Sequence, residues 1–155
     1  MRRIVLLIVM AIVVATLSSC GKEDKAAAPV ATAAPTSAAA ANGQVAVTVA
    51  DFKVGLVQHN LSPGKVTFTV VGAGPSTHEL VLFRTDLEPT KLPTNAEGTE
   101  VDEEGQGVQH IDEVEDVKVG TTKQLTVDLT PGNYVLLCNL AGHYKLGMET
   151  GLTVA

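Results

Sequence analysis

Short runs of alternating apolar and smaller or polar residues, separated by Gly and Pro turns, constrain the fold of this chain most. Val45, Val47 and Val49 form one such run, and residues 66–70 repeat the pattern. A period of two places every second side chain on one face of a β-strand. Further strands are expected at residues 52–58, 79–84, 124–129, 134–138 and 151–155. Many short strands of this kind predict an all-β sandwich with Greek-key connections.

The strand pattern fails in one long segment, at about residues 85–120. This segment contains several Gly and Pro residues and two acidic clusters, at 102–104 and 112–116. Connections of this length are usually functional, mobile or locally structured. We therefore expect an acidic insertion in the sandwich, in which residues 111–117 form one or two helical turns.

The first 20 residues have the pattern of an export signal. Two Arg residues precede the apolar run 4–17, which is shorter than the roughly 20 residues that a membrane helix needs. The run ends in Leu-Ser-Ser-Cys20, which resembles the lipobox of bacterial lipoproteins. The resemblance implies a signal peptide over 1–19 and a lipidated Cys20. We expect a membrane-anchored, extracytoplasmic protein, in the periplasm or at the outer cell surface.

Residues 20–43 carry the lipidated Cys and an Ala-, Pro- and Thr-rich stretch that reads as a flexible tether. Residues 44–155 then form the folded domain, which contains 15 Asp and Glu residues but only 7 Lys and Arg residues. Nucleic acid is excluded as a partner, because phosphate binding requires clustered basic side chains. A basic protein is the better electrostatic match.

The chain has two cysteines, Cys20 and Cys138. If Cys20 carries a lipid, Cys138 has no intrachain partner. A free thiol in an oxidising compartment is a liability unless it has a use. The alternatives are an inert buried thiol, an intermolecular disulfide, a nucleophile or a metal ligand.

Cys138, His143 and Met148 follow one another at intervals of five residues, and His78 begins a strand after a Gly-Pro turn. Two imidazoles, a thiolate and a weak thioether are the ligands of a blue-copper site. Such a set suits both Cu(I), which favours sulfur, and Cu(II), which favours nitrogen. Small rearrangement between the two states permits fast electron transfer.

The spacing Cys138-x4-His143-x4-Met148, after a Pro-Gly-x-Tyr turn, resembles the ligand loop of the cupredoxins, in their azurin, auracyanin, rusticyanin and sulfocyanin branches. The segments 64–70 and 74–80 resemble the strand and loop that deliver the first His of this family. The resemblance implies a sandwich of about eight strands with one copper ion (Cu+/Cu2+) near one end. It also implies electron transfer through the exposed edge of His143.

Two residues that directly follow predicted ligands, Glu79 and Asn139, are expected to lie beside the metal site. The family usually has Asn or Ser after its first His, where this chain has Glu79. We expect the Glu79 carboxylate to point away from the metal or to form a salt bridge elsewhere. Asn139, which follows Cys138, is the second residue expected to support the ligands.

These observations favour a single-electron carrier between extracytoplasmic redox partners, such as a basic cytochrome or a membrane oxidoreductase, and we expect a monomer. The alternative is copper storage or delivery outside the cytoplasm. An enzyme is disfavoured, because a second type of copper site needs more His residues than the 4 in the chain. His59 and His110 are expected to be solvated surface residues.

Four residues flank His143 in the sequence, and two interpretations of them are open. They form either an apolar rim where a partner docks or part of the packing at the end of the sandwich. The residues are Leu140, Ala141, Tyr144 and Leu146. The acidic clusters likewise form either a solvated face or a docking surface for a basic partner.

Overall fold

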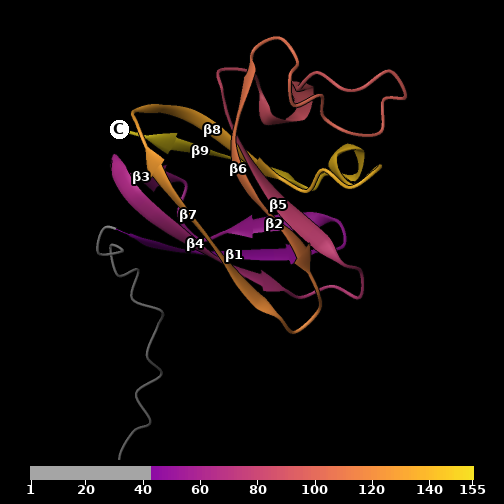
Figure 1. Ribbon diagram of the computed structural model, residues 1–155, viewed down its shortest axis with the longest axis horizontal. Coiled ribbons are helices and arrows are strands. Elements are labelled where there is room, and N and C mark those ends of the chain that lie inside the picture. Colours follow the sequence, from indigo (N-terminus) through magenta and orange to yellow (C-terminus); the bar gives the residue numbers. More distant parts are fainter. Residues whose placement is uncertain (1–42) are drawn as a thin grey trace, which may run out of the picture. The chain divides into compact units, whose positions relative to one another are not determined.

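The computed structural model describes residues 43–155, in which two β-sheets pack face to face (Figure 1). The first sheet has the order β2-β1-β4-β7, and its strands are β1 (Gln44–Ala50), β2 (Lys53–Leu56), β4 (Gly64–Gly72) and β7 (Thr122–Leu129). The second has the order β3-β9-β8-β5-β6, and its strands are β3 (Asn60–Leu61), β5 (His78–Thr85), β6 (Val108–Val117), β8 (Gly132–Leu137) and β9 (Glu149–Val154). The prediction of an all-β sandwich is confirmed.

The main core lies between the two sheets and is filled by alternate residues of each strand. Val45, Val47 and Val49 of β1 point inward, and Val47 lies beside Val70 of β4 in the parallel pairing of these strands. Phe68 is fully buried in the same layer. Truncating such an aromatic side chain to Ala costs about 3–5 kcal/mol. The period-two pattern in the sequence is therefore the pattern of the core.

The expectation of helical turns at residues 111–117 is wrong. This segment belongs to β6, which pairs antiparallel with β5 along its length. The acidic side chains suggested an irregular connection, but β6 is an edge strand, where charged residues face solvent and discourage pairing with other chains. With β6 and the two-residue β3, the described residues form 9 strands instead of about eight.

The remaining part of the insertion, residues 86–107, covers the outer face of the second sheet. It contains the short 3₁₀-helix η1 (Pro89–Lys91), and its Leu92 and Val101 pack on Val81 and Phe83 of β5. A second, smaller core results, so β5 is buried on both faces. This explains why the strand reads as a continuous apolar run in the sequence.

Several predictions for the N-terminal segment lie outside the described residues. They are the signal peptide over 1–19, the lipidated Cys20 and the tether up to residue 42. Within residues 43–155, no helix is long and apolar enough to cross a membrane.

Candidate metal centre

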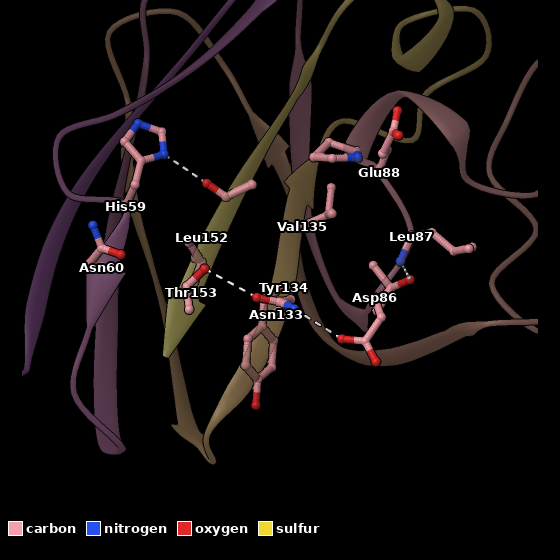
Figure 2. Close-up of a pocket in the computed structure, with 13 residues that line it drawn as sticks. His59, Asn60, Asp86, Leu87, Glu88, Asn133, Tyr134, Val135, Leu152 and Thr153 are labelled. Carbon is pink, nitrogen blue, oxygen red and sulfur yellow. Dashed lines mark hydrogen bonds between the residues drawn. The ribbon is translucent and has the colours of Figure 1, made fainter. Parts of the chain in front are cut away.

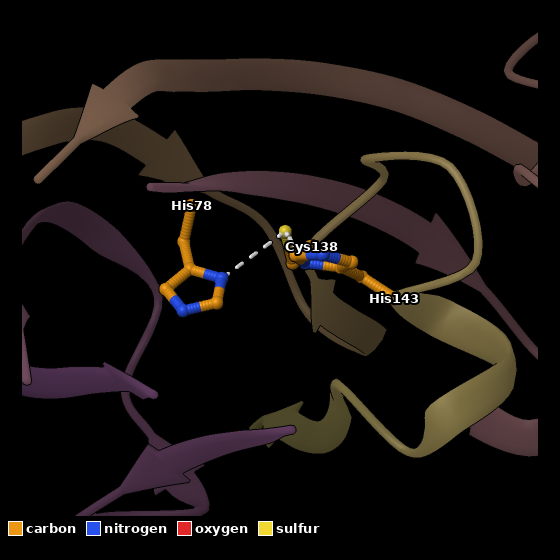
Figure 3. A group of neighbouring side chains, drawn as sticks. All are labelled: His78, Cys138 and His143. Carbon is orange, nitrogen blue, oxygen red and sulfur yellow. Dashed lines mark hydrogen bonds between the residues drawn. The ribbon is translucent and has the colours of Figure 1, made fainter. Parts of the chain in front are cut away.

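Three of the predicted ligands meet at one end of the main core (Figure 3). His78 begins β5, Cys138 directly follows β8, and His143 precedes the 3₁₀-helix η2 (Tyr144–Leu146). The Sγ atom of Cys138 lies 3.9 Å from Nδ1 of His78 and 3.4 Å from Nδ1 of His143. His78 and His143, which are 65 positions apart in the chain, thus present one nitrogen each to the same thiol.

Strand periodicity explains why these side chains face one another. His78 shares the inward parity of Leu80 and Leu82 on β5, and Cys138 shares that of Leu136 on β8. Both therefore point between the sheets. His78 and Cys138 are each 0% exposed, whereas His143 is partly exposed and is the member of the cluster nearest to solvent.

Backbone hydrogen bonds close the loop that carries Cys138, His143 and Met148. The N–H of Cys138 donates to the carbonyl of Met148 at 3.0 Å, and the N–H of Met148 donates to the carbonyl of His143 at 3.2 Å. Gly142 and Gly147 have φ angles of 85° and 96°, which L-residues with a Cβ rarely adopt. Met148 is 0% exposed, so its thioether belongs to the dry interior beside this loop.

The Cys138 thiol does not have the environment of a free nucleophile. Burial raises its pKa, while the backbone N–H groups of Glu79 and Leu140 interact with the sulfur and oppose this rise. A buried thiol with a raised pKa is unreactive toward substrates. Within the described residues Cys138 is not part of a disulfide. These observations disfavour the nucleophile and leave metal ligation as a use for this thiol.

Asp51 belongs to this site, although the sequence reasoning missed it. Its Oδ1 atom lies 2.8 Å from Nε2 of His78, and its Oδ2 accepts a hydrogen bond of 2.8 Å from the Ser76 hydroxyl. The hydrogen bond from Ser76 is the main reason why the pKa of Asp51 is lowered. Nε2 of His78 makes no well-aligned hydrogen bond among the described residues, and its contact with the Asp51 carboxylate is an ion-pair contact. No local signal links residues so far apart in the chain.

No protein-family model and no curated protein sequence matches this chain. Solved structures do match. The dithionite-reduced auracyanin of Roseiflexus castenholzii has a TM-score of 0.52 at 20% identity, covering 74% of this chain and 98% of that one. Auracyanin A of Chloroflexus aurantiacus has a TM-score of 0.54 at 18% identity, covering 74% and 100%. Rusticyanin of Thiobacillus ferrooxidans has a TM-score of 0.52 at 18% identity, covering 72% and 76%. The chain has the cupredoxin fold.

The surface of the domain around His143 is apolar in part. Phe52 contacts the His143 ring edge-on, with centroids 5.5 Å apart, and is 44% exposed. Leu146 is 58% exposed and Ala141 is also exposed, whereas Tyr144 is buried in the second core. Each of the two interpretations of the residues around His143 therefore holds for some of them. Ala141 and Leu146 belong to an exposed rim, whereas Tyr144 is packed in the interior. Sequence reasoning did not identify Phe52 as part of the rim.

Glu79 lies on the outer face of the second sheet, because it has the parity of Val81 and Phe83. Burial, and then repulsion from Glu113, raises the pKa of its carboxyl group to about 7, and the backbone N–H of Asn139 opposes this rise. Its carboxylate is not a member of the three-residue ligand cluster, and no ion pair of Glu79 occurs among the described residues. Of the two alternatives expected for Glu79, the salt bridge is therefore not present in residues 43–155.

Asn139 joins the loop that follows Cys138 to the insertion. Its Oδ1 accepts a hydrogen bond of 2.7 Å from the N–H of Val101, and its Nδ2 donates to the carbonyl of Val101 at 3.1 Å. Nδ2 also lies 3.1 Å from Oε1 of Glu103. The residue after Cys138 thus fixes the backbone of the second core.

His59 and His110 lie outside the ligand cluster. Nδ1 of His59 lies 2.7 Å from the carbonyl oxygen of Gly151, at the edge of a surface depression of about 370 Å³ (Figure 2). That depression shares no residue with the ligand cluster. His110 is partly exposed, as expected for a surface residue, but two carboxylates surround it.

The donor set of the cluster fits a transition metal. Two imidazole nitrogens and one thiol sulfur lie within 4.8 Å of one another in a site with no competing carboxylate among its members. Nitrogen with thiolate sulfur suits copper and zinc, whereas magnesium and calcium require oxygen ligands. The residues present therefore fit the copper ion that a cupredoxin fold implies.

Proposed function

We propose that this chain binds one copper ion through His78, Cys138 and His143, with Met148 as a weak fourth ligand, and transfers single electrons. The observation that carries the proposal is the convergence of both Nδ1 atoms on the Cys138 sulfur, at 3.9 Å and 3.4 Å. Two of the structurally similar proteins support it, since auracyanin A is a "blue" copper protein and rusticyanin is a copper protein.

A bound copper ion would supply the one-electron couple between Cu(I) and Cu(II). The chain supplies the environment. Cys138 must release its proton to bind, and the N–H groups of Glu79 and Leu140 favour the resulting thiolate. His78 and Met148 lie in the dry interior, which excludes water from the ligands. A loop closed by its own hydrogen bonds resists rearrangement between the two states.

His143 is the route for electrons in this proposal, because it is the ligand nearest to solvent. The exposed Phe52 and Leu146 beside it offer an apolar contact for a partner. The acidic charge of the domain favours a basic redox protein, such as a cytochrome, or a membrane oxidoreductase with a basic docking face. This carrier needs no substrate turnover of its own.

The visible spectrum tests the copper site. Purified protein should turn blue when Cu(II) is added, through charge transfer from sulfur to copper, and Cys138→Ser should stay colourless. His59→Gln is the matched control, because it removes an imidazole that lies outside the cluster, and it should keep the full colour. A colourless wild-type protein with one bound Cu(II) would contradict the proposed ligand set.

Copper retention separates the electron carrier from copper storage or delivery. A carrier should keep its copper through repeated oxidation and reduction in the presence of a Cu(I) chelator, whereas a delivery protein should lose it within the first reduced interval. Retention of the copper is favoured because three of the proposed ligands are enclosed in the core. Each of them is 0% exposed: His78, Cys138 and Met148.

We further propose that residues 1–19 direct export and that a lipid on Cys20 anchors the domain outside the cytoplasm. The support is the order of charge, apolar run and Leu-Ser-Ser-Cys in the sequence. Labelling with a radioactive fatty acid should mark the wild-type protein. Cys20→Ala should abolish the label and release the protein from the membrane fraction.

A further inference from the structure

A second group of metal-ligating side chains lies on the opposite side of the second sheet from the ligand cluster. Glu103 comes from the insertion, and His110 and Glu113 come from β6. Their ligand atoms all lie within 4.8 Å of one another. Oε2 of Glu103 is 3.8 Å from Nε2 of His110, and Oε2 of Glu113 is 3.9 Å from the same nitrogen.

A β-bulge brings His110 and Glu113 to one face of β6. Residues three apart in a regular strand point to opposite faces. Here Phe83 pairs with His110 and Leu82 with Asp112, so Ile111 is an extra residue on β6. The inserted residue reverses the parity and places both side chains on the same face of the sheet as Phe83. Bulges commonly re-aim side chains in this way next to active sites.

Two neighbours hold the group in place. Nδ2 of Asn139 donates to Oε1 of Glu103 at 3.1 Å, which leaves Oε2 of the same carboxylate facing His110. The Phe83 ring contacts the His110 ring edge-on at 5.6 Å between centroids. A hydrogen bond that orients a ligating carboxylate, as Asn139 orients Glu103, is typical of metal sites.

The separations fit a small divalent ion. Zinc binds nitrogen and carboxylate oxygen at about 2.0–2.2 Å, so two of its ligand atoms lie at most about 4.4 Å apart. The two contacts to His110 are already within this span. Two carboxylates face one imidazole in this group, so the group has unbalanced negative charge. A cation would relieve the repulsion between the carboxylates.

We propose that Glu103, His110 and Glu113 form a second metal site, which binds a divalent first-row transition ion such as Zn²⁺. The site is independent of copper binding at His78, Cys138 and His143, and it does not rest on the proposed electron transfer. One imidazole and two carboxylates leave at least one coordination position for water.

Titration of the full-length protein with Zn²⁺, followed through the imidazole signals of the 4 His residues in NMR spectra, tests this proposal. The His110 ring should shift with saturable binding, while the His59 ring serves as an internal reference. The rings of His78 and His143 report any occupation of the other cluster in the same spectra. The two sites are therefore followed separately.

Glu113→Gln keeps the reporting imidazole and removes one ligand charge, so it should weaken Zn²⁺ binding at His110 by about tenfold or more. Asp112→Asn is the matched control, because it removes the same charge from the neighbouring residue of β6, and it should change the affinity less than about twofold. A His110 ring that does not shift would overturn the proposal. Equal weakening by both variants would also overturn it, since it would show only diffuse attraction.

Discussion

The carboxylate of Asp51 lies 2.8 Å from Nε2 of His78, whose Nδ1 faces the thiol of Cys138. The imidazole therefore stands between a negative charge and the predicted metal position. A carboxylate in this place orients a ligating imidazole and increases its basicity. In the proposed copper site, Asp51 would act on the metal through His78 without itself being a ligand.

Asp51→Asn should keep the blue colour and raise the reduction potential. Removing the negative charge disfavours Cu(II) relative to Cu(I), and a shift of about 60 mV corresponds to about 1.4 kcal/mol for one electron. Cyclic voltammetry measures the potential. Ser76→Ala removes the hydrogen bond to Asp51 but leaves the charge, so its shift should be smaller. A lowered or unchanged potential in Asp51→Asn would exclude this role.

Met148→Leu should keep the sulfur-to-copper absorption and raise the potential, because the axial thioether tunes the couple while the thiolate gives the colour. The two side chains have similar volumes, and such exchanges in a core usually cost less than about 1.5 kcal/mol. Visible spectroscopy and voltammetry on the same sample provide both readouts. An unchanged potential would show that Met148 is core packing alone.

Tyr144→Phe should loosen the insertion. The Tyr144 hydroxyl accepts from the N–H of Leu92 at 2.9 Å and donates to the carbonyl of Pro89 at 3.0 Å. Leaving these buried groups unsatisfied costs about 1–3 kcal/mol of unfolding free energy. Hydrogen exchange at the Leu92 amide should accelerate. Tyr134→Phe removes a hydroxyl that bonds to Thr130 instead, so it should destabilise the fold without this effect on Leu92.

The free energy of unfolding of the metal-free protein should fall as pH rises from about 4.5 to about 7, in part because of Glu79. Its pKa is raised from 4.5 to about 7 in the folded state, so in this range the folded protein keeps a proton that the unfolded chain releases. Glu79→Gln should remove this component and stabilise the protein at pH 8 by about 1 kcal/mol, allowing for solvent screening.

Urea denaturation at pH 5 and pH 8 measures the effect of Glu79→Gln. The gain should be present at pH 8 and nearly absent at pH 5, where the carboxyl group of the folded protein is already neutral. Glu97→Gln is a suitable control, because Glu97 lies on the exposed part of the insertion. An equal gain in both variants would indicate a general effect of net charge.

The sequence by itself determined the strands of the main core and the residues proposed as ligands. Alternation of Val45, Val47 and Val49 is a local property that burial of one face enforces, so it is readable without neighbours. The spacing from Cys138 to Met148 is also local, because one loop carries three of the four residues. His78 lies in another strand, so it was proposed from its residue type and its place after a Gly-Pro turn, with support from the resemblance to a known family.

Tertiary structure alone decided the nature of β6, the second core and the neighbours of the ligands. The acidic segment 111–117 has no strand pattern, yet pairing with β5 makes it a strand, because hydrogen bonds to a neighbour outweigh weak local preference. The contacts of Asp51 with His78 and of Asn139 with Glu103 join residues that are distant in the chain. Such pairs leave no periodic signal, since only the packing of the sheets and of the insertion brings them together.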